Sequence, residues 1–390
     1  MKESFDNKIF LATVSIFFTA SIITAFLGAY IDICRVLYGI GICGVSYLIF
    51  KEYSLKSCSS FNKIVRVIFI VMLFLSTIVL FSGTQGSNFP IDIGAMGFML
   101  FGWRWYTIKQ KYLLILFSII FILSAFCFIY TKQWANLALV ANYDKGLGHA
   151  IWYTYTYMLC FATFVVPVAL FIDVNGNFEK FKWVIYASVV FAALICLITQ
   201  KRAVFVDTIL LILYLFIVRV KKINISYIIS VCICVIIGNY LLKAIGVDIL
   251  STLFDNLMNR FESTSDDMEN FDRYVEFKKW VATVTPLGFV FGEGIGSWQN
   301  VLGFDNYHLH IGWFNLIFKG GLFLALTVFI GMISNIVKAS KSKFEHKRAI
   351  IFLCVLVMIH LLHSTMWGYS IDAMTLSMAL YSSNKLKNYA

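Results

Sequence analysis

Charged residues are scarce in this chain of 390 residues. Only 14% of the residues are charged and 60% are hydrophobic, whereas soluble domains carry about 25% charged residues. The shortage excludes a soluble enzyme with one apolar core and a disordered chain. The net charge of +11 has an explanation other than nucleic acid, given below, so we expect no nucleic-acid partner. The composition predicts an all-α polytopic membrane protein that forms one transmembrane domain over residues 1–390.

Two motifs that often mark chemistry or secretion are also missing. The nine cysteines lie mostly in apolar runs and contain no CxxC pair, so we read them as small membrane residues and not as disulfides or metal ligands. The chain contains no Asp-x-Asp, the spacing that often holds a divalent ion on a sugar nucleotide. We therefore predict no metal site and no cofactor.

Long apolar windows are abundant and predict the spanning helices, each of about 20 residues. Ten windows have spanning length: 9–29, 34–50, 66–83, 112–131, 151–172, 183–199, 203–218, 224–242, 312–337 and 349–367. The shorter windows 91–103 and 371–383 raise the count to about twelve. The first follows Pro90 and contains three glycines, so it is either a short span or a re-entrant segment.

The distribution of basic residues predicts the topology. With a cytoplasmic N-terminus, 21 of the 32 lysines and arginines fall in loops on the cytoplasmic side, as the positive-inside rule requires. The basic charge then faces the anionic lipid surface, which makes membrane lipids a partner. We predict that both termini are cytoplasmic.

The outer side holds two long segments, 132–150 and 243–311. The second is a large outer loop in which an apolar stretch at 253–261 has helical spacing. Thr264 and Asp267 resemble a capping box for a helix that runs to about Val284 and ends before Pro286. On that helix we expect Arg273, Phe277, Trp280 and Val284 to share one face.

Several basic residues on the outer side run against the insertion bias. Lys201 and Arg202 open the window 203–218, where they are either a snorkelling pair or part of an anion site at a helix N-terminus. Arg273 is either a second anion ligand or half of a surface ion pair with Asp272 or Glu276. Arg260 and Arg35 are weaker candidates for the same anion.

Histidines gather on the same side. His308 and His310 precede the window 312–337, and His360 and His363 lie in the outer half of 349–367. No Cys, Asp or Glu spacing completes a metal motif around them. An outer histidine is usually a hydrogen-bonded structural group, and only its surroundings distinguish His310 as a candidate base.

Residues 195–370 resemble the bacterial O-antigen polymerase and O-antigen ligase superfamily, membrane glycosyltransferases of the GT-C type. Three stretches carry the resemblance: Gln200-Lys201-Arg202 at the opening of a span, Arg273 with Trp280 and the glycine turn at 292–296, and His310 eleven residues before Gly321. His363 also stands where such proteins often have a histidine.

The resemblance implies a donor oligosaccharide on undecaprenyl pyrophosphate. Arg202 and Arg273, with Lys201, Arg260 and Arg35 nearby, would hold the pyrophosphate because guanidinium groups bind it bidentately. His310 would take the proton of the attacking hydroxyl, with His308 and His363 close by. Trp280 would stack on a sugar, unless it belongs to the interfacial aromatic belt.

The function that we predict is an O-antigen polymerase, which joins lipid-linked repeat units at the periplasmic face of the bacterial inner membrane. Residues 243–311 then form a large periplasmic loop. A second lipid-linked glycan is then the acceptor, and a chain-length regulator is a candidate protein partner. The first alternative is an O-antigen ligase that transfers the same donor to lipid A–core. The second is a polysaccharide transporter or flippase, against which the outer position of the charges argues.

Overall fold

The computed structural model of the chain contains helices and no strand within the residues that it describes. These residues are 4–27, 32–53, 60–81, 97–109, 167–183, 185–186, 202–219, 272–294, 311–363 and 370–386, together with Tyr240, Leu309 and short pieces of 111–122. For this part of the chain, the all-α prediction is confirmed.

The N-terminal region forms three long helices, α1 (Phe5–Leu27), α2 (Asp32–Tyr53) and α3 (Ser60–Phe81). They coincide with the first three apolar windows. Residues 97–101 are helical and continue into a 3-10 turn, η1 (Gly102–Tyr106). Helical pieces at 167–174 and 178–183 flank a turn at Gly176, where φ is 73°.

The C-terminal region contains the longest described helix, α15, and several shorter elements. They are α9 (Arg202–Tyr214) with the π-helical η3 (Leu215–Arg219), α12 (Asp272–Thr283), α13 (Pro286–Phe291), α15 (Gly312–Lys341), α16 (Lys347–His363), α17 (Ser370–Leu380) and the 3-10 turn η5 (Ser382–Leu386). Helix α12 ends before Pro286, as the sequence predicts. The predicted surface helix at 253–261 lies outside the described residues.

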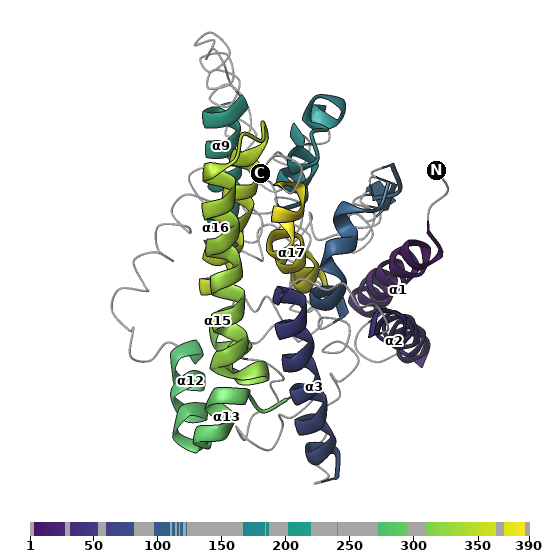
Figure 1. Ribbon diagram of the computed structural model, residues 1–390, viewed down its shortest axis with the longest axis vertical. Coiled ribbons are helices and arrows are strands. Elements are labelled where there is room, and N and C mark those ends of the chain that lie inside the picture. Colours follow the sequence, from purple (N-terminus) through teal and green to yellow (C-terminus); the bar gives the residue numbers. More distant parts are fainter. Residues whose placement is uncertain are drawn as a thin grey trace.

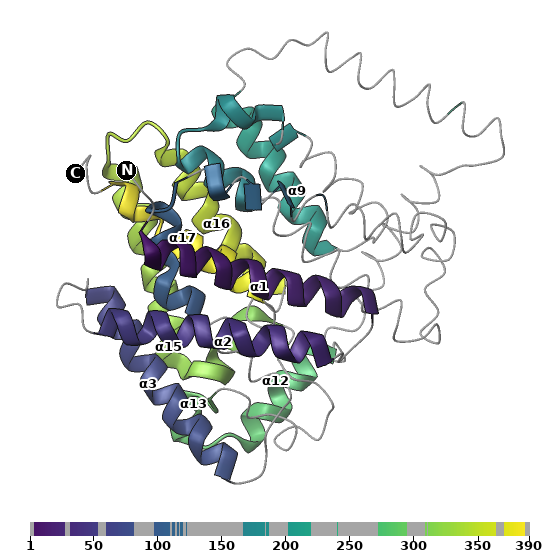
Figure 2. The same cartoon turned by 90° about the vertical axis from the view of Figure 1, so that its right-hand side faces the viewer.

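Helices α15 and α16 pack side by side along the long axis of the molecule, with α12 and α13 at the lower end in Figure 1. Helices α1 and α2 also pack against each other, but they lie across this axis, as Figure 2 shows. The described helices are therefore not all parallel. Among them, α15 is the one that is long and apolar enough to cross a membrane.

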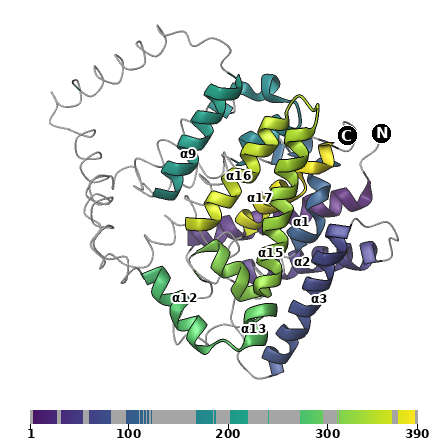
Figure 3. The same cartoon turned by 60° about the vertical axis from the view of Figure 1, so that its left-hand side comes forward.

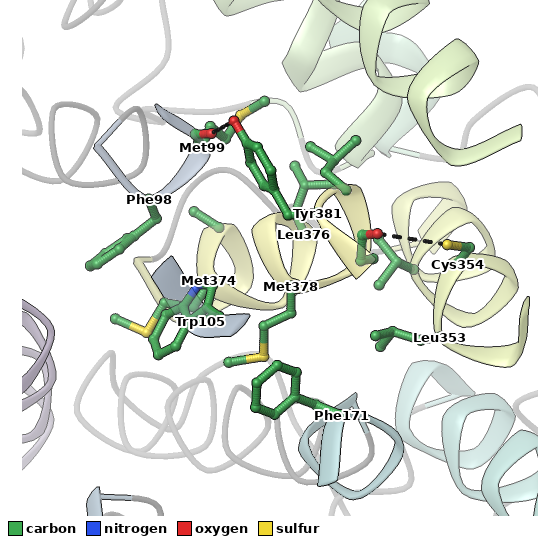
Figure 4. Packing of buried hydrophobic residues seen from close by; sticks show 14 of the residues in the cluster. Phe98, Met99, Trp105, Phe171, Leu353, Cys354, Met374, Leu376, Met378 and Tyr381 are labelled. Atoms are coloured by element: carbon green, nitrogen blue, oxygen red, sulfur yellow. Dashed lines mark hydrogen bonds between the residues drawn. The ribbon is translucent and has the colours of Figure 1, made fainter. Parts of the chain in front are cut away.

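The main core forms where α17 and η1 meet. Trp105 is buried and its Nε1 donates to Ser377 Oγ at 2.9 Å. The Tyr381 hydroxyl donates to the carbonyl of Met99 at 2.7 Å, and both side chains point into the apolar cluster of Figure 4. These bonds connect segments about 280 residues apart, and they fix residues 97–105 against α17 and the residue that follows it.

Candidate functional site

Helix α15 is broken at Gly321, where φ is 73° and ψ is 176°. The indole ring of Trp313 lies 5.9 Å from the ring of Phe329, although residues 16 apart on a straight helix are separated by about 24 Å. The nine residues before the break therefore fold back on the rest. The predicted span 312–337 is divided, and the 20 residues from 322 to 341 form a stretch about 30 Å long.

A glycine turn fills the break. The backbone N–H of Glu293 donates to the Phe318 carbonyl at 2.7 Å, and that of Gly294 donates to the Lys319 carbonyl at 3.1 Å. A continuous helix would offer these carbonyls to the N–H groups of residues 322 and 323. The turn, defined here as Gly292, Glu293 and Gly294 and called the Gly292 turn, thus satisfies acceptors that the break releases.

The close contact between the Gly292 turn and the break in α15 explains why each of the two segments has a glycine there. Gly292 has φ 84° and Gly321 has φ 73°, in the left-handed region that glycine adopts without strain. A Cβ atom on Gly321 would collide with the backbone of Val290, and one on Gly292 would collide with the Lys319 carbonyl. The two glycines that the sequence singled out therefore meet at one junction.

Helix α13 holds the Gly292 turn in place. Thr285 caps its N-terminus by accepting a hydrogen bond from Gly288 N at 3.0 Å, and Pro286 occupies the first helical position, where its missing N–H is not needed. Gly292 ends the helix. As a result α13 packs against α15 and lies below it in Figure 3.

An aromatic cluster joins α12 to the first half of α15. Trp280 is fully buried, and its ring lies 5.5 Å from that of Phe318 and 6.1 Å from that of Phe289. Phe277 stacks on Phe314 at 3.7 Å. Leu309, the residue before His310, is buried in the same group, which we call the Trp280 cluster. The predicted shared face of α12 is confirmed for Phe277, Trp280 and Val284.

The burial of Trp280 bears on its predicted contact with a sugar. Aromatic neighbours surround the ring, so its role in this structure is to centre the Trp280 cluster, and the sugar contact stays a prediction. Its Nε1 is buried and makes no bond of hydrogen-bond geometry to any described group. Burial raises the pKa of the nearby Glu293 carboxyl, and the Trp280 indole lowers this pKa by a smaller amount.

Two polar residues of α15 were missed by the sequence analysis. Asn315 and Lys319 are both fully buried although their side chains are polar. They lie one turn apart in an otherwise apolar stretch. Asn315 Oδ1 accepts a hydrogen bond from Leu309 N at 3.3 Å. The signal was present in the sequence: a lysine and an asparagine at positions i and i+4 of an apolar run share one helical face.

The helices locate four of the predicted site residues. Arg35 lies in α2, Arg202 begins α9, Arg273 is the second residue of α12 and His363 ends α16, but their side chains are outside the described part. His360 is buried on α16. Lys201, Arg260, His308 and His310 lie outside the described residues. The convergence of these groups on one anion therefore stays a prediction.

A second polar cluster, which the sequence did not indicate, lies near the opposite end of α15. Asp173 is fully buried; it accepts a hydrogen bond from the Tyr214 hydroxyl and pairs with His346 Nδ1 at 3.0 Å. We call these three residues the Asp173 cluster. Nearby in the core, the buried Arg104 donates to Asn7 Oδ1 at 2.8 Å and lies 3.9 Å from Asp6.

Metal binding has no visible basis in the described ranges, where no three His, Cys, Asp or Glu side chains gather. Comparison with models of known protein families found no match. Comparison with curated proteins found none either. The site therefore rests on its own geometry: a broken helix, a glycine turn that caps it, and buried polar groups beside the residue that precedes His310.

Proposed function

We propose that this protein is a membrane glycosyltransferase that polymerises lipid-linked oligosaccharide repeat units at the periplasmic face of the bacterial inner membrane. One observation carries the proposal: the Gly292 turn docks on the break at Gly321, beside Trp280 and Leu309. Two of the three stretches that resemble the O-antigen polymerases and ligases thus meet in space, although they are distant in sequence.

The membrane setting is supported by the surface of α15. Beyond the break the helix exposes large apolar side chains, at positions 323, 326, 329, 330, 333 and 337, and soluble proteins rarely expose so many in one place. The distribution of basic residues supports twelve spans with both termini in the cytoplasm. Helices α1 and α2 fit a bundle of twelve spans least. They lie across the long axis of the molecule, whereas spanning helices tilt by about 20° on average.

The proposed reaction is a glycosyl transfer between two lipid-linked glycans. A hydroxyl oxygen of the acceptor attacks the anomeric carbon of the donor, and the bond from that carbon to the pyrophosphate oxygen breaks. Arg202 and Arg273 stabilise the negative charge that develops on the leaving lipid pyrophosphate. His310 takes the proton of the attacking hydroxyl. No metal is required in this scheme, because the arginines supply the positive charge.

The ligase alternative uses the same donor and the same proton transfer, so the described residues do not distinguish it. The transporter alternative gains support from one observation. Helix α15 is discontinuous and carries the buried Lys319 beside the break, and discontinuous helices with charged groups form the binding sites of many transporters.

The decisive experiment uses purified protein and a lipid-linked repeat unit as the single substrate. A polymerase forms lipid-linked oligomers from it. Product that appears only after addition of lipid A–core would establish a ligase instead. Movement of the lipid-linked glycan across a vesicle membrane without any new glycosidic bond would establish a transporter.

The catalytic assignment is tested with Arg202→Ala, Arg273→Ala and His310→Ala. Both arginine variants should abolish polymer at normal protein levels, and lysine should restore it poorly because it lacks the guanidinium fork. His310→Ala should reduce the rate by about 10²–10⁴-fold, the usual contribution of a general base. Lys338→Ala, at an exposed lysine of α15, is the control. Full polymer from both arginine variants would refute the assignment.

The topology is tested by labelling Ser265→Cys in a variant without the nine native cysteines. We expect a membrane-impermeant reagent to reach this residue from the periplasm. Labelling from the cytoplasm alone would place 243–311 on the wrong side for the proposed substrate.

A further inference from the structure

The side-chain amide of Asn315 is only half used by the protein. Its Oδ1 accepts from Leu309 N at 3.3 Å, which fixes the orientation of the amide because only the oxygen can accept. Its Nδ2 is fully buried and has no hydrogen-bond partner among the described residues. Buried amide donors are nearly always satisfied, so an acceptor from outside the described chain is expected.

Another buried asparagine of α15 provides the contrast. Asn335 Nδ2 donates to the carbonyls of Ala379 and Leu380 at 2.9 and 2.7 Å, and these bonds connect α15 to the end of α17. Asn335 therefore has an evident structural role. Asn315 has the same chemistry and the same burial, but its donor group does not serve the fold in this way.

The neighbouring residue indicates what kind of acceptor fits. Lys319 follows Asn315 by one turn on the same face and is also fully buried, with its Nζ 5.6 Å from the centre of the Phe318 ring. Side chains at i and i+4 of a helix are about 5–6 Å apart at their Cβ atoms. An acceptor with more than one oxygen atom suits two donors at this spacing, and the lysine favours one that is negatively charged.

The place of this pair in the fold connects it to the candidate site. The Lys319 carbonyl accepts a hydrogen bond from Gly294 N. The Asn315 side chain accepts one from the backbone N–H of Leu309, which directly precedes His310. Lys319 thus bonds to the Gly292 turn, and Asn315 bonds to the residue that precedes His310 in the sequence. The nearby acidic group is Glu293, and burial raises its pKa, which favours the neutral form and reduces repulsion of an anion.

We propose that Asn315 Nδ2 and Lys319 Nζ form an anion subsite that binds phosphate oxygens of a lipid pyrophosphate. The identity of this ligand rests on the proposed function, whereas the existence of an anion subsite rests on the geometry of α15. The subsite adds two donors from α15 to the arginines that the sequence indicates.

The test measures binding without any requirement for turnover. Detergent-purified protein is titrated with inorganic pyrophosphate and, separately, with undecaprenyl pyrophosphate, and the dissociation constant is obtained from the shift in thermal unfolding. Asn315→Asp keeps the acceptor for Leu309 and removes the donor; Lys319→Met removes the cation, and Lys319→Arg retains it. Lys338→Met, at an exposed lysine of the same helix, is the matched control.

We expect Asn315→Asp and Lys319→Met each to raise the dissociation constant at least about tenfold, as for loss of a hydrogen bond to a charged group, and Lys319→Arg to raise it less. The Lys338→Met control should bind as the wild type does. Weakening with the lipid form alone would still support the subsite and would show that the lipid is its source of phosphate.

Two results overturn the subsite: no binding of either probe by the wild type, or equal binding by the wild type, Asn315→Asp and Lys319→Met. A wild type that still polymerises repeat units in that case keeps the proposed function intact. Conversely, binding that depends on Lys319 in a protein that forms no glycosidic bond supports the subsite and refutes the glycosyltransferase. If Lys319→Met fails to fold, Asn315→Asp decides, because it preserves the shape and the Leu309 contact.

Discussion

Two regions of the molecule bury polar groups in different ways. In the Asp173 cluster and around Arg104, each buried charge meets a partner from another segment: Asp173 meets Tyr214 and His346, and Arg104 meets Asn7. Beside the Gly292 turn, Trp280 Nε1 and Asn315 Nδ2 are buried without such a partner in the described chain. The first pattern is typical of groups that stabilise a fold. The second leaves buried donors for which the described fold provides no acceptor.

The largest effect that sharpens this comparison is expected at the break itself. Gly321→Ala should destabilise the protein by more than about 4 kcal/mol, because the backbone has φ 73° and the new Cβ atom meets the Val290 carbonyl. Gly39→Ala is the control, since a Cβ atom on Gly39 has nothing within 4 Å; alanine should be neutral or favourable there. Unfolding temperature and yield of monodisperse protein are the measurements. A fully stable Gly321→Ala would show that the break is not required.

The next effect concerns the Asp173 cluster. Asp173→Ala should cost about 3 kcal/mol of stability, because it removes a fully buried acceptor and leaves His346 and Tyr214 without it. Glu179→Ala, at an exposed acid whose ion pair with Lys182 is solvated, should cost less than about 0.5 kcal/mol. Polymer formed per folded molecule should be unchanged in both. A specific loss of activity in Asp173→Ala would erase the contrast between the two regions.

A smaller effect compares two buried tryptophans. Trp105→Phe should cost about 1 kcal/mol more than Trp280→Phe, because Trp105 Nε1 donates to Ser377 Oγ at 2.9 Å whereas Trp280 Nε1 makes no such bond in the described part. Both changes remove a similar volume from an aromatic environment. Chemical denaturation of the two variants measures the difference. Equal costs would indicate that the indole N–H of Trp280 is satisfied after all.

The smallest effect is a dependence of stability on pH at Glu293. Since burial raises the pKa of this carboxyl in the folded state, its contribution is fully present below the unfolded value of 4.5 and is lost as pH rises through the folded pKa. Glu293→Gln should therefore flatten the decrease in unfolding temperature between acidic and neutral pH. Glu345→Gln, at an exposed acid, is the control. A decrease identical to that of the wild type would place the Glu293 carboxyl in water.

The positions of the long helices follow from local features of the sequence. Its shortage of charge and its long apolar windows predicted helices where α1, α2, α3 and α16 lie, because hydropathy and helical periodicity are local properties. The spacing on α12 also predicted the face that packs, since residues at i, i+3 and i+7 align on any helix. The motifs even indicated Gly292 and Gly321 as important positions.

The contacts that these positions make depend on the tertiary packing and cannot be read from local patterns. The hydrogen bond from Glu293 N to the Phe318 carbonyl joins residues 25 apart, and no local pattern shows that a break in α15 is capped from another segment. Asn315 and Lys319 lie in a window that is apolar on average, so hydropathy does not distinguish them. Their complete burial results from contacts with segments outside α15, among them Leu309 and the Gly292 turn. Whether a buried donor has an acceptor depends on the groups that pack around it, and the fold determines which groups those are.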